Sequence, residues 1–207
     1  MFEFLAKGGF FMYPILFCSV LSLAIFLDKV WVLRKKKVVP RELLQGVEDF
    51  VRRGQILQAE SFCRQNNTPM ARILISGLKN FGKKKEDIKA VMEKTGRQEV
   101  AILAKYIEAV ATIAAICPLL GLLGTVSGMI KAFGVISLAG VGNPSILAGG
   151  IAEALIATAA GLSVAVPSYV AYKYLIGKVD SYSLEMEQTS LEIVDLMGEG
   201  EIIEEKL

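Results

Sequence analysis

The sequence predicts an all-α membrane protein with three transmembrane helices, the second and third long and extended into the cytoplasm, and a helical cytoplasmic insert. Three observations predict this fold class. Hydrophobic residues make up 53% of the 207 residues, more than a soluble domain of this size can bury. Three stretches are apolar enough to cross a hydrocarbon core of about 30 Å, which takes roughly 20 helical residues. No stretch shows a convincing strand alternation.

The first apolar stretch, GGFFMYPILFCSVLSLAIFL, runs from Gly8 to Leu27 without a charge. A secretory signal peptide is the alternative interpretation. However, the preceding residues include one acid and one base, Glu3 and Lys7, and no A-x-A cleavage site follows. We therefore expect an uncleaved span, whose bulky aromatic residues suit a lipid-facing position.

The second stretch, AVATIAAICPLLGLLGTVSGMI, is bounded by Glu108 and Lys131. The third begins where Asn143 can cap a helix and Pro144 can occupy its first position, and it ends around Lys173. We expect both helices to continue into the cytoplasm, the second as one helix with the segment that starts at residue 86.

Prolines and glycines inside these two spans predict their geometry. Pro118 and Pro167 each free a backbone carbonyl, and each is either a hinge or a tolerated kink. The stretch GLLGTVSG contains a G-x-x-x-G spacing, typical of closely packed membrane helices. It is not a phosphate loop, because no strand precedes it and no GK[ST] follows. The glycines expected at helix contacts are Gly121, Gly124, Gly128 and Gly161.

Basic residues predict the orientation of the spans. The run RKKK at 34–37 follows the first span, further lysines and arginines precede the second, and Lys173 follows the third, whereas the loop between the second and third spans is uncharged. Basic residues gather on the cytoplasmic side, so the N-terminus is expected outside and the C-terminus inside. The expected segments are a short external N-terminus with the first transmembrane helix (1–33), a cytoplasmic helical domain (34–105), the second transmembrane helix (106–136), a short periplasmic loop (137–144), the third transmembrane helix (145–176) and a cytoplasmic C-terminal helix with an acidic tail (177–207).

The cytoplasmic segments are predicted to be amphipathic helices. Pro40 opens and Gly54 closes a stretch whose apolar residues share one helical face, and Pro69 and Gly82 bound a second such stretch. The tail carries an apolar stripe on a charged helix, which predicts a packing face. The stripe consists of Val179, Tyr182, Met186, Ile193 and Leu196.

Several classes of function are disfavoured by composition. The three cysteines form no CxxC pair, so neither a disulfide framework nor a zinc site is expected. The absence of histidine removes the commonest metal ligand and general base, so we expect no metal, no cofactor and no enzymatic activity. No basic and aromatic interleaving suggests a nucleic-acid partner. A secondary transporter is disfavoured because the spans show no inverted repeat.

The stretch GGIAEALIATAAGLSVAVP, residues 149–167, contains one carboxylate, Glu153. At 1.5 Å per residue it lies about 13 Å beyond Pro144, close to the bilayer midplane. An ionised acid there costs on the order of 2.5–3.5 kcal/mol. One interpretation is a neutral carboxyl that only packs against a neighbouring helix. We favour a titratable group beside a water path, because Gln or Ser would serve packing at lower cost.

Thr125 and Thr158 are weaker candidates. Each hydroxyl can either bond back to its own helix or contribute to a polar path. Glu153 and Thr158 are separated by about 140° at 100° per residue, so they cannot form a tight pair on one helix. A polar contact between them would have to cross to another helix or subunit.

The pattern PLLGLLGTVSGMI, followed later by GGIAEALIATAAGLSVAVP, resembles the ExbB/TolQ/MotA superfamily of ion-driven motor subunits, and most closely the ExbB/TolQ branch. The resemblance implies a proton channel subunit of the bacterial inner membrane that couples the proton motive force to mechanical work, with TonB-dependent outer-membrane transport as the expected process. A TolQ-like or gliding-type motor subunit and a non-conducting membrane scaffold are the alternatives.

The resemblance also implies partners and roles. The subunits would form a pentameric ring around the single span of an ExbD/TolR-like protein with a membrane aspartate, and a TonB/TolA-like protein would be the third component. Glu153 matches the family's pore glutamate, and Thr125 and Thr158 match its pore-lining threonines. Pro118 and Pro167 are similar to the paired prolines of the flagellar branch. The branch, the cargo and the choice between protons and sodium stay open.

Overall fold

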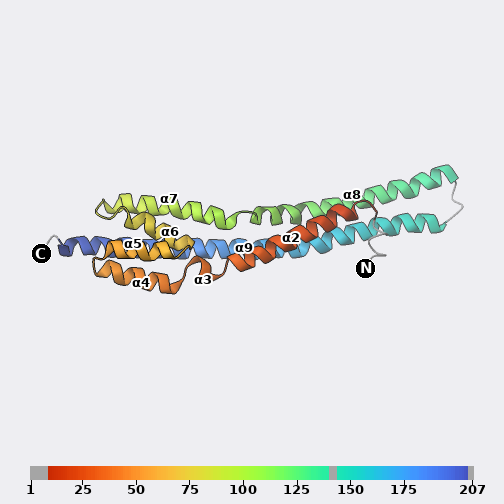
Figure 1. Cartoon of the computed structure of the whole chain (residues 1–207). Coiled ribbons are helices and arrows are strands. Elements are labelled where there is room, and N and C mark those ends of the chain that lie inside the picture. The colour runs from red at the N-terminus through yellow and green to blue at the C-terminus, as the bar shows by residue number, and fades with distance from the viewer. Residues whose placement is uncertain (1–8, 140–143, 205–207) are drawn as a thin grey trace. The chain divides into compact units, whose positions relative to one another are not determined.

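The computed structural model describes residues 9–139 and 144–204, with side chains for 9–134 and 148–198, and every regular element in these ranges is an α-helix (Figure 1). Three of the described helices are long and apolar enough to cross a membrane. The predicted all-α fold class is confirmed. The chain divides into two compact units, which we call the first unit (Met1–Asp28 with Tyr106–Tyr174) and the second unit (Lys29–Lys105 with Leu175–Leu207).

Three helices supply the described part of the first unit: α2 (Met12–Val32), α8 (Ile107–Ala139) and the N-terminal part of α9 (Pro144–Glu204). Helix α2 begins and ends later than the predicted first span. Helix α9 begins at Pro144, as predicted, and continues without interruption for 61 residues. The expected cap Asn143, like Glu3 and Lys7, lies outside the described residues.

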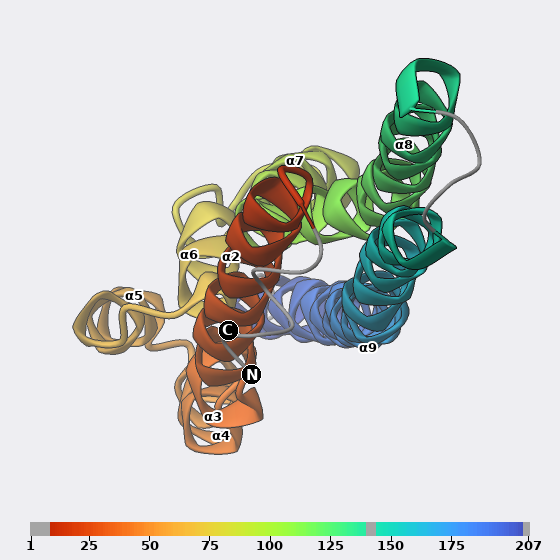
Figure 2. The same cartoon turned by 90° about the vertical axis from the view of Figure 1, so that its right-hand side faces the viewer.

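Side-chain contacts connect the three helices of the first unit. Figure 2 shows the ribbons of α2, α8 and α9 seen from one end. Ile113 and Cys117 of α8 form an apolar cluster with Ala165 of α9. Ser22 of α2 and Ser168 of α9, both buried, share a hydrogen bond of 2.8 Å. Each buried hydroxyl is thereby satisfied, as an apolar environment requires.

The second unit contains five further helices: α3 (Lys35–Val38), α4 (Arg41–Arg52), α5 (Ile56–Gln65), α6 (Pro69–Leu78) and α7 (Lys85–Ala104). Successive helices from α4 to α7 pack on one another. Helix α6 begins with a cap, since the Thr68 hydroxyl accepts a hydrogen bond from the Ala71 N–H. Gly54 and Gly82 have φ angles of 70° and 82°, in the left-handed region where glycine is favoured.

The C-terminal part of α9 contributes its apolar stripe to the core of the second unit. Val179, Tyr182, Met186 and Ile193 are buried, so the predicted packing face is confirmed at these positions, and Leu196 is half-buried. The Tyr182 hydroxyl donates to the Leu33 carbonyl at 2.9 Å. The stripe is therefore a core element.

An ion pair between a buried carboxylate and a partly exposed arginine connects α6 to α7. Glu99 is 5% exposed, and both of its oxygens accept hydrogen bonds of 2.6 Å, from Nε and Nη2 of Arg72. The hydrogen bonds to Glu99 raise the pKa of Arg72 above its ordinary value. On α5, burial and then the charge of Glu60 raise the pKa of the Cys63 thiol to about 12, so this thiol stays protonated near neutral pH.

The expectation of one continuous helix from residue 86 through the second span is wrong. Helix α7 ends at Ala104 and α8 begins at Ile107, because Tyr106 adopts a φ of 69° that no α-helix accommodates. The buried ammonium of Lys29 donates to the Leu103 carbonyl at 3.1 Å. Cations stabilise the terminal carbonyls of a helix, so Lys29 helps to end α7 here.

Candidate functional site

The carboxyl group of Glu153 lies among three segments of the first unit. Helix α9 carries Glu153 in its third turn, and Lys131 of α8 donates from Nζ to Oε1 at 2.8 Å. Gly9, just before α2, has a φ of 70°, and a Cβ at this position would collide with Oε1. The backbone of Gly9 therefore packs directly against the carboxyl group.

Lys131 is the functional candidate that sequence reasoning missed, since it had served only to mark the end of the second span. A short connection makes α8 and α9 antiparallel, so residues equally far from its centre face each other. Lys131 and Glu153 lie eleven positions on either side of position 142. This symmetry is the sequence signal that could have found the pair.

Thr125 of α8 and Thr158 of α9 lie at the same helix contact and share a hydrogen bond between their hydroxyl oxygens. The Thr125 hydroxyl also lies 3.2 Å from the carbonyls of Gly121 and Ala154. The Thr158 hydroxyl lies 3.2 Å from the Gly121 carbonyl. The hydrogen-bond partners of Thr158 therefore lie on α8, across the helix contact, and do not include Glu153. The Thr125 hydroxyl is bonded both to a carbonyl of its own helix and to α9.

Small residues allow this close contact between α8 and α9. A Cβ on Gly161 would lie 2.5 Å from the Cys117 carbonyl oxygen, and one on Gly121 would lie 3.0 Å from the Ala157 carbonyl oxygen. Gly124 and Gly128 approach Ala157 and Ala154 in the same way. Pro118 and Pro167 lie inside α8 and α9. The pair of Thr125 and Thr158 therefore lies in a stretch where small residues bring α8 and α9 close together.

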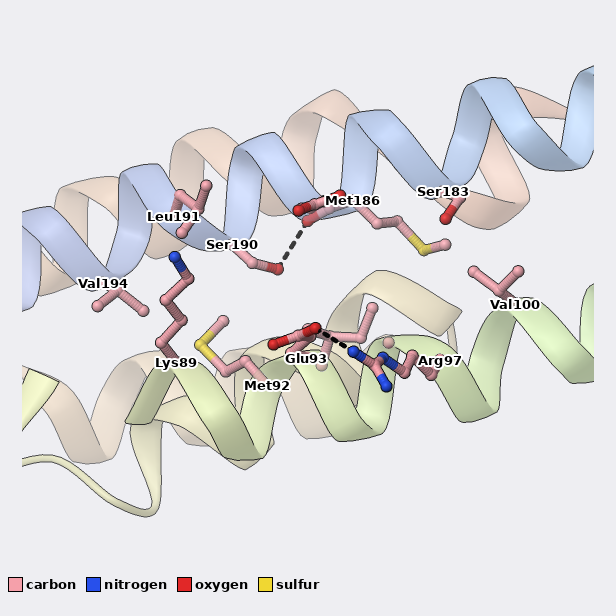
Figure 3. Close-up of a pocket in the computed structure, with 13 residues that line it drawn as sticks. Lys89, Met92, Glu93, Arg97, Val100, Ser183, Met186, Ser190, Leu191 and Val194 are labelled. Atoms are coloured by element: carbon pink, nitrogen blue, oxygen red, sulfur yellow. Dashed lines mark hydrogen bonds and ion pairs between the residues drawn. The ribbon is translucent and has the colours of Figure 1, made fainter. Parts of the chain in front are cut away.

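The second unit contains a cavity of about 480 Å³ between α7 and α9 (Figure 3). Met92 and Met186 line it with other apolar residues, while Lys89 and the ion-paired Glu93 and Arg97 lie on its α7 side (Figure 3). The hydroxyl of Ser190, which also lines the cavity, donates to the Met186 carbonyl of its own helix. Within residues 9–139 and 144–204, no group of three acidic or thiol side chains is arranged to hold a metal ion.

Comparisons with known proteins agree with the resemblance. Residues 65–188 match the MotA/TolQ/ExbB proton channel family. A Synechocystis sp. protein named "Putative biopolymer transport protein ExbB-like 1" is 34% identical over 182 residues, covering 84% of this chain and 69% of the relative. The Salmonella typhimurium "Biopolymer transport protein ExbB" is 35% identical over 120 residues, 55% of this chain and 49% of that protein. The Haemophilus influenzae "Tol-Pal system protein TolQ" is 42% identical over 84 residues, 41% of this chain and 37% of that protein.

A solved structure titled "Structure of C. jejuni MotAB" has the same fold. The similarity has a TM-score of 0.55 at 21% identity and covers 90% of this chain and 74% of that chain. The matched segments span about half or less of the Salmonella and Haemophilus relatives.

Proposed function

The chain belongs to the MotA/TolQ/ExbB proton channel family, and from this premise we propose that it is a stator subunit that conducts protons across the bacterial inner membrane. Each proton supplies about 2.3 kcal/mol per 100 mV of membrane potential, enough to bias a mechanical step in a partner. The process that we propose is TonB-dependent outer-membrane transport, in keeping with the ExbB names of several relatives.

This proposal rests on one observation: the apolar part of α9 contains a single carboxylate. Glu153 is the only acid between Pro144 and Val179. An ionisable group in an apolar span is costly and marks an ion pathway by default. The hydroxyls of Thr125 and Thr158 extend the polar groups along the same helix contact, and we assign these three residues to the proton pathway. Pro118 and Pro167 are proposed hinges.

The exposed apolar surface of the first unit supports a membrane location and an assembly. Phe10, Phe17, Leu119, Phe133 and Leu155 are each more than half exposed in the single chain. Such surface needs lipid or other subunits. We propose a homopentamer around the single span of an ExbD/TolR-like partner with a membrane aspartate, with a TonB/TolA-like protein as the third component. The basic run at 34–37 favours a periplasmic N-terminus and a cytoplasmic C-terminus.

Two other functions stay open to test. The similarity to a Tol-Pal system protein favours a TolQ-like motor role as the second candidate, and a gliding-type motor belongs to the same class. A non-conducting scaffold would use Glu153 only to dock a partner helix. We infer a channel role rather than an enzymatic one, in keeping with membership of a proton channel family.

The experiment that tests the proposal is partner-dependent proton flux in liposomes. Glu153→Ala should abolish flux and leave the assembled ring intact. Glu153→Gln keeps the volume and hydrogen bonding but cannot titrate, so it should also abolish flux, whereas Glu153→Asp should retain part of it. Glu108→Gln is the matched control, because Glu108 is an exposed acid in the first turn of α8. Normal flux through an assembled Glu153→Gln ring would mean that Glu153 only packs against a neighbouring helix and that the proton site belongs to the partner alone.

A further inference from the structure

Lys131 has no role in the function proposed above, yet its position is unusual. It is the only basic residue between Ile107 and Gly134 of α8, a stretch of high mean hydropathy. A lysine within an apolar span costs free energy as an acid does, and such residues pair with one another. Its presence therefore needs a reason.

The backbone around Lys131 is fixed, whereas its ammonium group is accessible. The next residue, Ala132, is 3% exposed and packs against Gly150 of α9. This contact sets the position of Lys131 relative to α9. The Lys131 side chain is 57% exposed and the Glu153 side chain 27%, and a single hydrogen bond joins them. A flexible four-carbon stem can break such a contact while the helices stay in place.

Among residues 9–134 and 148–198, no second charged side chain pairs with this carboxyl. Gly9 presents only its backbone, and the α9 residues next to Glu153 in sequence, Ala152 and Ala154, have no polar side chain. The hydroxyls of Thr125 and Thr158 are bonded to each other and to carbonyls. In the part of the chain that the structure describes, Lys131 is the one cation paired with Glu153.

We propose that Lys131 is a positioning residue that holds the Glu153 carboxyl against Gly9 through their ion pair, so that Glu153 accepts a proton only when the ammonium group moves away. An adjacent cation favours the carboxylate over the carboxylic acid. As a step of conduction this inference rests on the proposed function, but the pairing itself can be measured without any flux. The state with Lys131 paired is the resting state of the site.

Dicyclohexylcarbodiimide tests the pairing, because it modifies protonated carboxyl groups in apolar surroundings. The full chain, reconstituted in liposomes, is treated at one fixed pH, and the adduct at Glu153 is quantified by peptide mass spectrometry. We expect slow modification of the unchanged protein. Lys131→Gln should increase the rate by about tenfold or more, the factor that a lost interaction of about 1.4 kcal/mol produces. Lys131→Arg keeps the cation and should restore slow modification.

Three controls decide the result. Lys173→Gln removes an exposed lysine further along α9 and should leave the rate unchanged. Glu153→Gln gives the background, and Lys131→Met, with circular dichroism, provides a second neutral variant if Lys131→Gln unfolds. Equal rates in the unchanged protein and both neutral variants would overturn the proposal, as would fast modification in Lys131→Arg. Because modification needs no conduction, normal flux in Glu153→Gln would remove Glu153 from the proposed proton pathway and leave the pairing with Lys131 standing.

Discussion

The two units satisfy their buried polar groups in different ways. In the second unit a full charge is buried, and the carboxylate of Glu99 receives two hydrogen bonds from Arg72. In the first unit the buried or half-buried pairs are hydroxyls, Ser22 with Ser168 and Thr125 with Thr158. The ion pair of the first unit, Lys131 with Glu153, has one hydrogen bond and stays partly exposed.

The difference teaches where each unit obtains its stability. The second unit has an apolar core of large side chains, including Leu43, Met70, Leu74 and Ile193. It also tolerates the buried and hydrogen-bonded charges of Glu99 and Lys29. In the first unit α8 and α9 approach until glycines meet carbonyl oxygens. Packing of small residues is the main attraction between membrane helices, where no hydrophobic effect drives association. The same substitution should therefore have different effects in the two units.

The largest effect on stability should come from removing the partner of the buried Glu99 carboxylate in the second unit. Arg72→Met leaves Glu99 buried without its partner and should lower the free energy of unfolding by about 3–5 kcal/mol. Urea denaturation of the full chain in mild detergent, followed by circular dichroism, measures this. Arg97→Met is the control, since the Arg97 side chain is 79% exposed and its pair with Glu93 should contribute at most about 1 kcal/mol. Similar losses of unfolding free energy in Arg72→Met and Arg97→Met would contradict the distinction between the pair with a buried carboxylate and the exposed pair.

Alanine substitutions at two glycines of α9 should have intermediate effects on stability, and the two effects should differ in sign. Gly161→Ala places a Cβ 2.5 Å from the Cys117 carbonyl oxygen and should destabilise the first unit by about 1–3 kcal/mol. Gly177→Ala, in the second unit, meets no atom within 4 Å and should instead stabilise α9 by up to about 1 kcal/mol. Thermal denaturation measured by tryptophan fluorescence and circular dichroism compares them. A stabilising Gly161→Ala would mean that close backbone contact does not hold α8 to α9.

The smallest effect should come from the serine pair. Ser22→Ala and Ser168→Ala should each destabilise by about 0.6 kcal/mol, the average for a hydrogen bond between membrane helices. The double variant should lose less than the sum of the two, because neither hydroxyl is then left unpaired. A double-mutant cycle on the free energy of unfolding measures the coupling. Strict additivity would show that the two hydroxyls do not interact.

Much of the fold could be predicted because its signals are local. Pro144 marks the start of α9, and the periodic apolar residues mark the stripe that packs in the second unit. The break before α8 could not be predicted, because it involves a lysine 74 positions earlier in the chain, Lys29. A local pattern that favours a helix carries no information about such a distant donor.

The residues of the candidate site also divide into those that the sequence predicts and those that it does not. Glu153 stands out in the sequence because it is an acid in an apolar stretch, and Thr125 and Thr158 follow from the motifs. Lys131 was missed because its neighbours made it look like the end of a span, although the antiparallel arrangement of α8 and α9 would have paired it with Glu153. The contact with Gly9 depends on the conformation of a single residue far away in sequence, which no periodicity reveals.

Because Gly9 contacts the Glu153 carboxyl, substitutions at these two positions, which are distant in sequence, should affect each other during evolution. Any other side chain at position 9 has to adopt a left-handed backbone, and its Cβ also requires the Glu153 carboxyl to move. A shorter acid at 153 removes the collision but not the backbone strain. Gly9→Ala should thus be tolerated better beside Asp than beside Glu. In a diverging lineage, residue 9 should therefore change more readily after residue 153 has changed, and the order of substitutions is biased at this site.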